Sequence, residues 1–280
     1  MNLKKISVEL QDGSRCSGGT VFMRPGEKAV FRVSESAKGM RWFLIKADCR
    51  EYDQFAYWKS SRRGPMKLAY RVYDTGITDA AYSIIADECG TIYLYNGNMP
   101  HDAVIAEDLP LQVKYTNRIF QITVRFDDTY TGYLSELSGT PFILPPGPVG
   151  DSHQTDLRMG SDCAEFAIYG MRRMQRKIPY TGPGGILDHL TINAQGCVPD
   201  ARGLYHDSNG KTIRVEKSGV QRGDIIHFGA QVSVFYEDRG IPGLLDKDDI
   251  LMQSYGSCPV KTTFEHCSFY HYPFKVGQWK

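Results

Sequence analysis

Apolar and polar residues alternate in short runs as far as about residue 126, with the two-residue period of strands that have one buried face. Pro25-Gly26 and Asn96-Gly97 lie at the ends of such runs, and each predicts a turn. The predicted strands are residues 20–23, 28–33, 41–46, 67–73, 91–95, 111–115 and 119–126. Because many short strands recur with turn signals and no long helical pattern interrupts them, residues 1–128 are expected to form an all-β, sandwich-like domain.

The pattern changes after residue 128. Residues 130–137 predict a short helix, and the Pro-Pro-Gly-Pro run at 145–148 predicts a rigid loop. Apolar residues at helical spacing then predict a helix that begins at Cys163, followed by a helix and a long loop within 182–209. The remaining predicted strands are 223–228 and 231–236, joined as a hairpin, and 250–255. Residues 129–280 are therefore expected to form a second, α+β domain in which a helix packs on an antiparallel sheet.

Composition and charge exclude only a few classes of function. The chain has 280 residues, of which 41% are hydrophobic and 23% charged, as in ordinary globular proteins. A formal net charge of +1 argues against nucleic acid or an anionic membrane as the main partner, and no segment is apolar for long enough to span a bilayer. Residues 1–6 are basic but lack the apolar run of a signal peptide. We expect a cytoplasmic protein, or a periplasmic or extracellular one if a native leader is missing from this sequence.

The cysteine content leaves the redox compartment open. An odd number of cysteines leaves at least one unpaired, so three disulfides with Cys163 reduced would suit export, whereas seven thiols would suit the cytosol. No pair has the Cys-x-x-Cys spacing of a zinc site, and no metal or other cofactor is predicted. The seven cysteines are Cys16, Cys49, Cys89, Cys163, Cys197, Cys258 and Cys267.

Cys163 is the strongest candidate for chemistry because it falls in the first turn of a predicted helix. Ser161 or Asp162 can act as the N-cap, although a carboxylate at Asp162 would oppose thiolate formation. The positive end of the helix dipole would stabilise a thiolate, which is the reactive form of a cysteine nucleophile. The alternative is a small buried residue at a helix start.

Several motifs share their order with one enzyme family. They are Ser-Gly-Thr-Pro-Phe at 138–142, Ser-Asp-Cys at 161–163, Lys-Ile-Pro at 177–179, Gly-Asp-Ile-Ile-His-Phe at 223–228 and Gln-Val-Ser-Val-Phe-Tyr at 231–236. Together they resemble the NlpC-type cell-wall cysteine peptidases, a bacterial branch of the papain-like fold, over about half of the chain. The resemblance implies a papain-like second domain that cuts peptide bonds involving D-amino acids in peptidoglycan. It also implies an N-terminal β domain that recognises wall material.

The chain differs from that family at the position of the catalytic base. The resemblance places the family's catalytic histidine at Gln231, its third polar residue near Gln253 and its first-motif tyrosine at Phe142. Glutamine does not accept a proton at neutral pH, so a strict transfer of roles predicts an inactive protein.

His227 offers another base. A three-residue link at 228–230 would place His227 opposite Gln231 on one face of the hairpin. In this hypothesis Cys163 is the nucleophile and His227 the base, while Gln231 orients the ring or donates to the oxyanion. The alternative is that His227 is a core or hairpin histidine with satisfied hydrogen bonds.

Other polar residues are weaker candidates. His153 lies ten residues before Cys163 and could line the substrate site with Phe142 and Asp162, or lie on a solvated loop. The basic run of Arg172, Arg173, Arg176 and Lys177 suits a helix C-terminus, or alternatively a site for acidic peptide carboxylates.

Three hypotheses follow. The first is a cysteine peptidase or amidase acting on peptidoglycan stem peptides or related amides through Cys163. The second is a papain-like pseudoenzyme that binds cell-wall or peptide ligands. The third is a surface interaction protein built on the β-sandwich.

Overall fold

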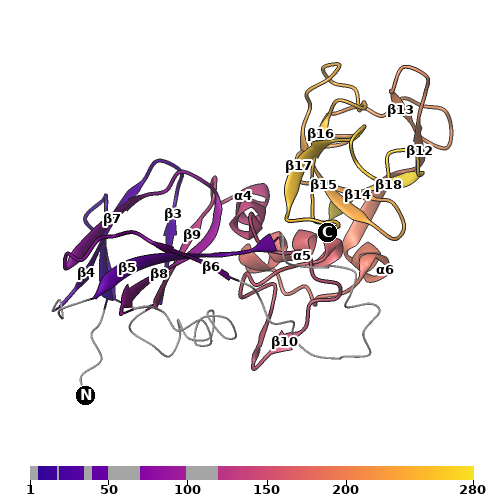
Figure 1. Cartoon of the computed structure of the whole chain (residues 1–280). Helices are drawn as coiled ribbons and strands as arrows, with labels where there is room; N and C mark the ends of the chain where they lie inside the picture. Colours follow the sequence, from indigo (N-terminus) through magenta and orange to yellow (C-terminus); the bar gives the residue numbers. More distant parts are fainter. Residues whose placement is uncertain (1–5, 18, 35–39, 50–69, 99–118) are drawn as a thin grey trace. The chain divides into compact units, whose positions relative to one another are not determined.

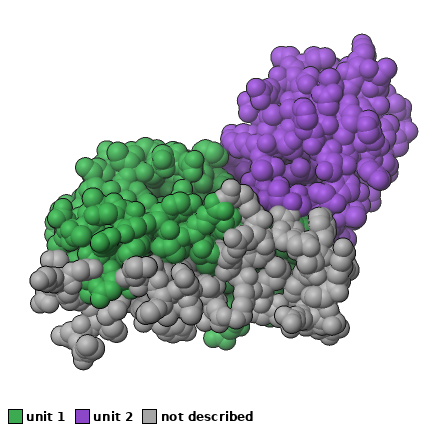
Figure 2. Space-filling model, viewed as in Figure 1, with its two compact units in different colours: residues 1–128, 135–160 green, residues 129–134, 161–280 purple. Residues whose placement is uncertain are grey.

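The computed structural model describes residues 6–17, 19–34, 40–49, 70–98 and 119–280. The predicted strand 111–115 and the first half of 67–73 lie outside these ranges. The described chain is a mixed α and β protein, mostly strands with three short α-helices. It divides into two compact units (Figure 2): the first unit comprises residues 1–128 and 135–160, and the second comprises 129–134 and 161–280.

The first unit contains two larger β-sheets (Figure 1). The four-stranded sheet has the order β2 (Arg15–Ser17), β1 (Ile6–Leu10), β4 (Lys28–Val33) and β7 (Ala81–Ile85). The five-stranded sheet has the order β3 (Gly19–Met23), β9 (Ile119–Val124), β8 (Gly90–Gly97), β5 (Arg41–Ala47) and β6 (Tyr70–Asp74). Its β3–β9 pair is parallel and the other strand pairs are antiparallel.

The alternating pattern explains how these sheets pack. Phe31 from the four-stranded sheet and Trp42, Leu94 and Phe120 from the five-stranded sheet belong to one buried core. Their intervening neighbours point to the opposite faces, as the two-residue period of a strand requires. The predicted strands at 20–23, 28–33, 41–46, 91–95 and 119–126 are found as β3, β4, β5, β8 and β9.

One turn prediction in this unit was wrong. Asn96-Gly97 does not form a hairpin turn but ends β8, where Asn96 pairs with Trp42 and Gly97 with Arg41. The partner strand β5 extends far enough to pair with both residues, so tertiary pairing overrides the local preference for a turn.

A short helical segment follows the strands. The predicted helix at 130–137 is found as α4 (Tyr130–Leu134) and the 3-10 turn Ser135–Leu137. The proline-rich loop leads into a small hairpin of β10 (Pro148–Val149) and β11 (Ser152–His153) within the first unit.

The second unit contains a curled, antiparallel seven-stranded sheet (Figure 1). Its order is β13 (Tyr205–His206), β12 (Leu190–Pro199), β18 (Phe274–Trp279), β14 (Ile225–His227), β15 (Val232–Glu237), β16 (Ile250–Gln253) and β17 (Val260–Thr263). The helices of this unit are α4, α5 (Cys163–Arg173) and α6 (Pro183–Ile186), followed by the 3-10 turn Leu187–His189. The long loop predicted within 182–209 is largely the strand β12, because β18, which the sequence pattern did not predict, pairs along it.

The two faces of the curled sheet have different partners. Phe235, Leu251, Phe264 and Phe274 belong to the core on one face. Helix α5 packs against β15 and α4, and it buries the predicted apolar residues Ala167, Ile168 and Met171.

The cysteines exclude both predicted arrangements, three disulfides and seven thiols. The residues that remain thiols are Cys16, Cys89, Cys163, Cys197 and Cys267. Three disulfides are therefore wrong for this chain, and seven thiols are wrong because Cys49 and Cys258 are disulfide-bonded. Within the described ranges, every helix is too short or too polar to cross a bilayer.

Candidate functional site

The N-terminus of α5 is built as the sequence predicts. Asp162 is the N-cap, with an extended backbone, and its Oδ1 accepts a 2.8 Å hydrogen bond from the Glu165 N–H. This bond satisfies one of the amides that a helix start leaves without an intrahelical partner. Asp162 is nearly buried, and burial raises the pKa of its carboxyl to about 6 although the amides of Glu165 and Ala164 oppose the rise.

The Cys163 thiol is buried at the start of α5. Its side chain is 4% exposed. Burial raises the pKa of the Cys163 thiol to about 12, the charge of Asp162 adds to the rise, and the backbone N–H groups of Val232 and Ala164 oppose it. Burial of the sulfur thus opposes the thiolate that the helix N-terminus was expected to stabilise.

A serine pair fixes the loop before α5 to the sheet. Ser254, directly after β16, donates from Oγ to the Ser161 carbonyl oxygen at 3.2 Å, and the two hydroxyls lie 3.5 Å apart. Both serines are completely buried. Together with the Val232 N–H, which donates to Cys163, this contact places the thiol beside the beginning of β15.

The register of the β14–β15 hairpin separates His227 from Gln231. His227 pairs with Val232, and the Phe228 N–H donates to the Gln231 carbonyl oxygen at 2.8 Å. The turn thus consists of two residues, Gly229 and Ala230, rather than three. Since neighbouring strand residues point to opposite faces, His227 lies on the face of Val232 and Gln231 on the other. The prediction that the two side chains face each other was wrong.

Both ring nitrogens of His227 are engaged. Nε2 lies 2.7 Å from the carbonyl oxygen of Pro183 in α6, and Nδ1 lies 3.1 Å from the Gly229 N–H. Because the Gly229 N–H can only donate and the Pro183 carbonyl can only accept, these contacts fit a proton on Nε2 and a lone pair on Nδ1. The side chain is 4% exposed and connects the hairpin turn to α6, as the structural alternative for His227 requires.

The two glutamines belong to a buried polar group on the other face. Gln253 Oε1 accepts from Ser233 Oγ at 3.2 Å and from Cys267 Sγ at 3.4 Å. Gln231 Nε2 donates to the Val232 carbonyl oxygen at 3.0 Å. Within the described part of the chain, the fully buried Gln231 Oε1 has no hydrogen-bond partner. Cys267 and Ser254 were missed from sequence because their roles depend on tertiary contacts that no local motif signals.

Two of the predicted substrate-site residues belong to the first unit. Phe142 is 1% exposed there, and His153 lies in β11, where its Nδ1 is 3.4 Å from the Thr155 N–H. Cys163, His227, Gln231 and Gln253 all belong to the second unit.

The basic run serves the end of α5. Arg172 donates to the Ile178 carbonyl oxygen at 2.9 Å and lies over the Tyr180 ring, while Arg173 lies over the Tyr133 ring. These contacts agree with the helix-end role of the run.

Comparison of the chain with protein-family models, with curated proteins and with solved structures found no match in any of the three.

Proposed function

We propose that the second unit is a papain-like, NlpC-related domain that has lost thiol catalysis and binds cell-wall or other peptide ligands. The observation that carries this proposal is the state of Cys163: its buried thiol, with a pKa raised to about 12, lies beside the beginning of β15, and Gln231, directly before that strand, stands where the family has its base. Nucleophilic cysteines need a partner that removes their proton, and Gln231 does not do this.

The engagement of His227 supports the same conclusion. A base must have a ring nitrogen with an accessible lone pair, whereas Nδ1 of His227 accepts from Gly229 and Nε2 donates to Pro183. Recruiting His227 as a base would require breaking its contact with α6.

Gln231 supports a binding role. A buried acceptor without a partner costs about 1–3 kcal/mol, and a ligand amide that reached Gln231 Oε1 would recover part of this cost. Peptides supply such amide donors along their backbone.

The test compares binding with turnover. The full-length chain is incubated with purified sacculi and with soluble stem peptides, and both retention and fragment release are measured. The proposal expects retention without release, and release that disappears in a Cys163→Ala variant would overturn it. Replacing Gln231→His restores an imidazole at the family's base position and should produce measurable release or faster thiol alkylation, whereas the same change at the exposed Gln195 should not.

A cysteine peptidase or amidase is the second candidate, favoured by the Val232 N–H that donates to the sulfur of Cys163 at the N-terminus of α5. In this case the wild-type chain releases fragments, and iodoacetamide blocks the release in proportion to Cys163 alkylation.

A further inference from the structure

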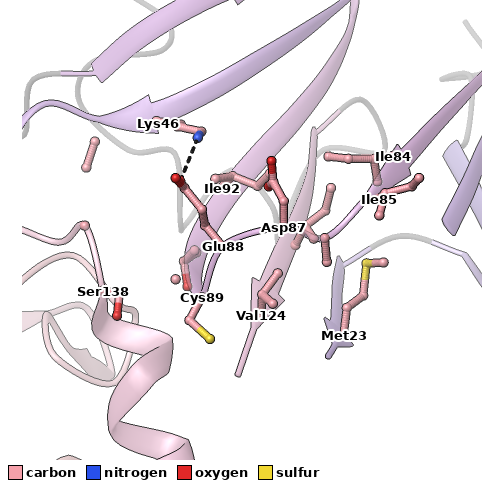
Figure 3. A pocket seen from close by; sticks show the side chains of 16 residues that line it. Met23, Lys46, Ile84, Ile85, Asp87, Glu88, Cys89, Ile92, Val124 and Ser138 are labelled. Atoms are coloured by element: carbon pink, nitrogen blue, oxygen red, sulfur yellow. Dashed lines mark ion pairs between the residues drawn. The ribbon is translucent and has the colours of Figure 1, made fainter. Parts of the chain in front are cut away.

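A cavity of about 110 Å³ opens at one end of the first unit, between its two sheets (Figure 3). The five-stranded sheet contributes residues of β3, β5, β8 and β9 to its walls. The four-stranded sheet contributes the end of β7, and the β7–β8 connection at 86–89 forms the rim.

The interior of this cavity is apolar because it continues the core of the unit. Met23, Ile122 and Val124 line it and are each at most 3% exposed. Ile92 and Ile84 come from the two facing sheets and pack partly buried against the same core. All five are aliphatic or thioether side chains, which favour a ligand group of the same kind.

The mouth carries charge where the strand pattern would supply another apolar residue. Trp42, Leu44 and Lys46 alternate along β5, so Lys46 occupies an inward-facing position at the end of the strand. Its Nζ lies 3.7 Å from a carboxylate oxygen of Glu88, beyond hydrogen-bond distance, and the two side chains point toward one another across the rim (Figure 3). Their side chains are 45% and 78% exposed, and the carboxylate of Asp87 also lines the mouth.

We propose that this cavity binds a small zwitterionic α-amino acid with an aliphatic side chain. The ligand carboxylate pairs with Lys46 and its ammonium with Glu88 and Asp87, so one molecule with both charges replaces the long contact across the rim. The side chain enters between Met23 and Ile92. An apolar cavity of about 150 Å³, lined by aliphatic and phenylalanine side chains, holds benzene, so this smaller one suits a branched side chain of four carbons. The site is independent of the function proposed for Cys163.

The experiment is isothermal titration of the full-length chain with L-leucine. The single-charge analogues 3-methylbutylamine and 4-methylpentanoate keep the branched chain but lack one charge, and L-serine keeps both charges but lacks the apolar group. The proposal expects binding of L-leucine and at least about tenfold weaker binding of all three analogues. Absence of L-leucine binding, or equal binding of either single-charge analogue, would overturn it.

Variants locate the binding. Lys46→Met keeps the aliphatic stem and Glu88→Gln keeps the shape, so each should weaken L-leucine binding at least about tenfold without unfolding the unit. The matched control is Arg15→Met. It removes the cation of a different exposed ion pair, Arg15–Glu9 on the β1–β2 hairpin. Loss of affinity in Arg15→Met equal to that in Lys46→Met, or unchanged affinity in Lys46→Met, would show that the cavity is not the site.

Discussion

His227 in β14 donates from Nε2 to the carbonyl oxygen of Pro183, 2.7 Å away, at the first residue of α6. Pro183 has no amide hydrogen, but its carbonyl oxygen accepts this bond from the sheet. The His227 side chain that donates it is buried. The contact ties the helix that follows the α5 segment to the hairpin whose second strand lies beside Cys163. The histidine that was hypothesised to be a relocated base thus connects the hairpin to α6.

The first prediction concerns that connection. Replacing His227→Ala removes two hydrogen bonds from a buried site, so the free energy of unfolding should fall by about 1–3 kcal/mol in chemical denaturation. Alkylation of Cys163 by iodoacetamide in the folded variant should proceed at the wild-type rate. The exposed His271→Ala serves as the control for stability. Alkylation at least about tenfold slower in a folded His227→Ala protein would instead identify His227 as the base.

The second prediction separates the two roles of Asp162. Asparagine caps helices as well as aspartate but carries no charge, so near pH 8 Asp162→Asn should keep the cap and raise the free energy of unfolding by removing a buried charge. Because the Asp162 charge contributes to the raised pKa of Cys163, the same variant should alkylate several-fold faster near pH 8.

Asp162→Ala is the matched comparison, since it removes both the charge and the cap. It should be about 1 kcal/mol less stable than Asp162→Asn and should also increase the alkylation rate. Equal stability of the two variants would mean that the bond to the Glu165 amide contributes nothing to the helix.

Much of the fold could be predicted because local signals and tertiary structure agree. The alternation in 28–33 and 119–126 places Phe31 and Phe120 in one core, and the Asp162 cap with the apolar residues of 167–171 defines α5. In these segments each local preference points to the same buried face. The cavity of the first unit could not be predicted. Its charged mouth depends on Lys46, one polar residue at an inward-facing position of an otherwise regular strand, and a single such residue is no signal of a binding site.

The state of the candidate site could not be predicted because it depends on quantities that no motif contains. A turn one residue shorter than expected moves His227 to the opposite face from Gln231. The pKa of Cys163 depends on how completely the sulfur is buried, and the Ser161–Ser254 contact joins residues 93 positions apart. The sequence identified the helix and its cysteine, whereas the pKa of the thiol and the face on which His227 lies depend on tertiary packing.

The third prediction is a dependence of stability on pH. Burial raises the pKa of Asp162, Asp224 and Asp249 to about 6 each, above the value of about 3.9 expected in the unfolded chain. Between these values the folded state binds more protons than the unfolded state, so the free energy of unfolding rises as the pH falls. From about pH 7.5 to about pH 5 each carboxyl should contribute roughly 1 kcal/mol to the rise.

The variant Asp224→Asn checks this dependence. Asparagine keeps an oxygen that can accept from the Gln221 amide and the Gln278 side chain, but it does not titrate. Urea denaturation at the two pH values should show a rise smaller by about 1 kcal/mol than in wild type, and no such change for the exposed Asp188→Asn. A rise of the same size in Asp224→Asn would assign the pH dependence to other groups.

The fourth prediction concerns the packing of α4 on α5. A Cβ at Gly170, in the middle of α5, would lie 2.7 Å from the Tyr130 ring and 2.9 Å from Leu134. Alanine is the better helix former by about 1 kcal/mol, but it would push α4 away and weaken the 2.9 Å bond from the Tyr130 hydroxyl to the Ala167 carbonyl oxygen. Gly170→Ala should therefore lower the free energy of unfolding by about 1–3 kcal/mol. At Gly184 in α6 a Cβ would meet nothing within 4 Å, so Gly184→Ala should be neutral or stabilising. Thermal denaturation of both variants measures the difference, and equal stabilities would show that α4 yields to the added methyl group at little cost.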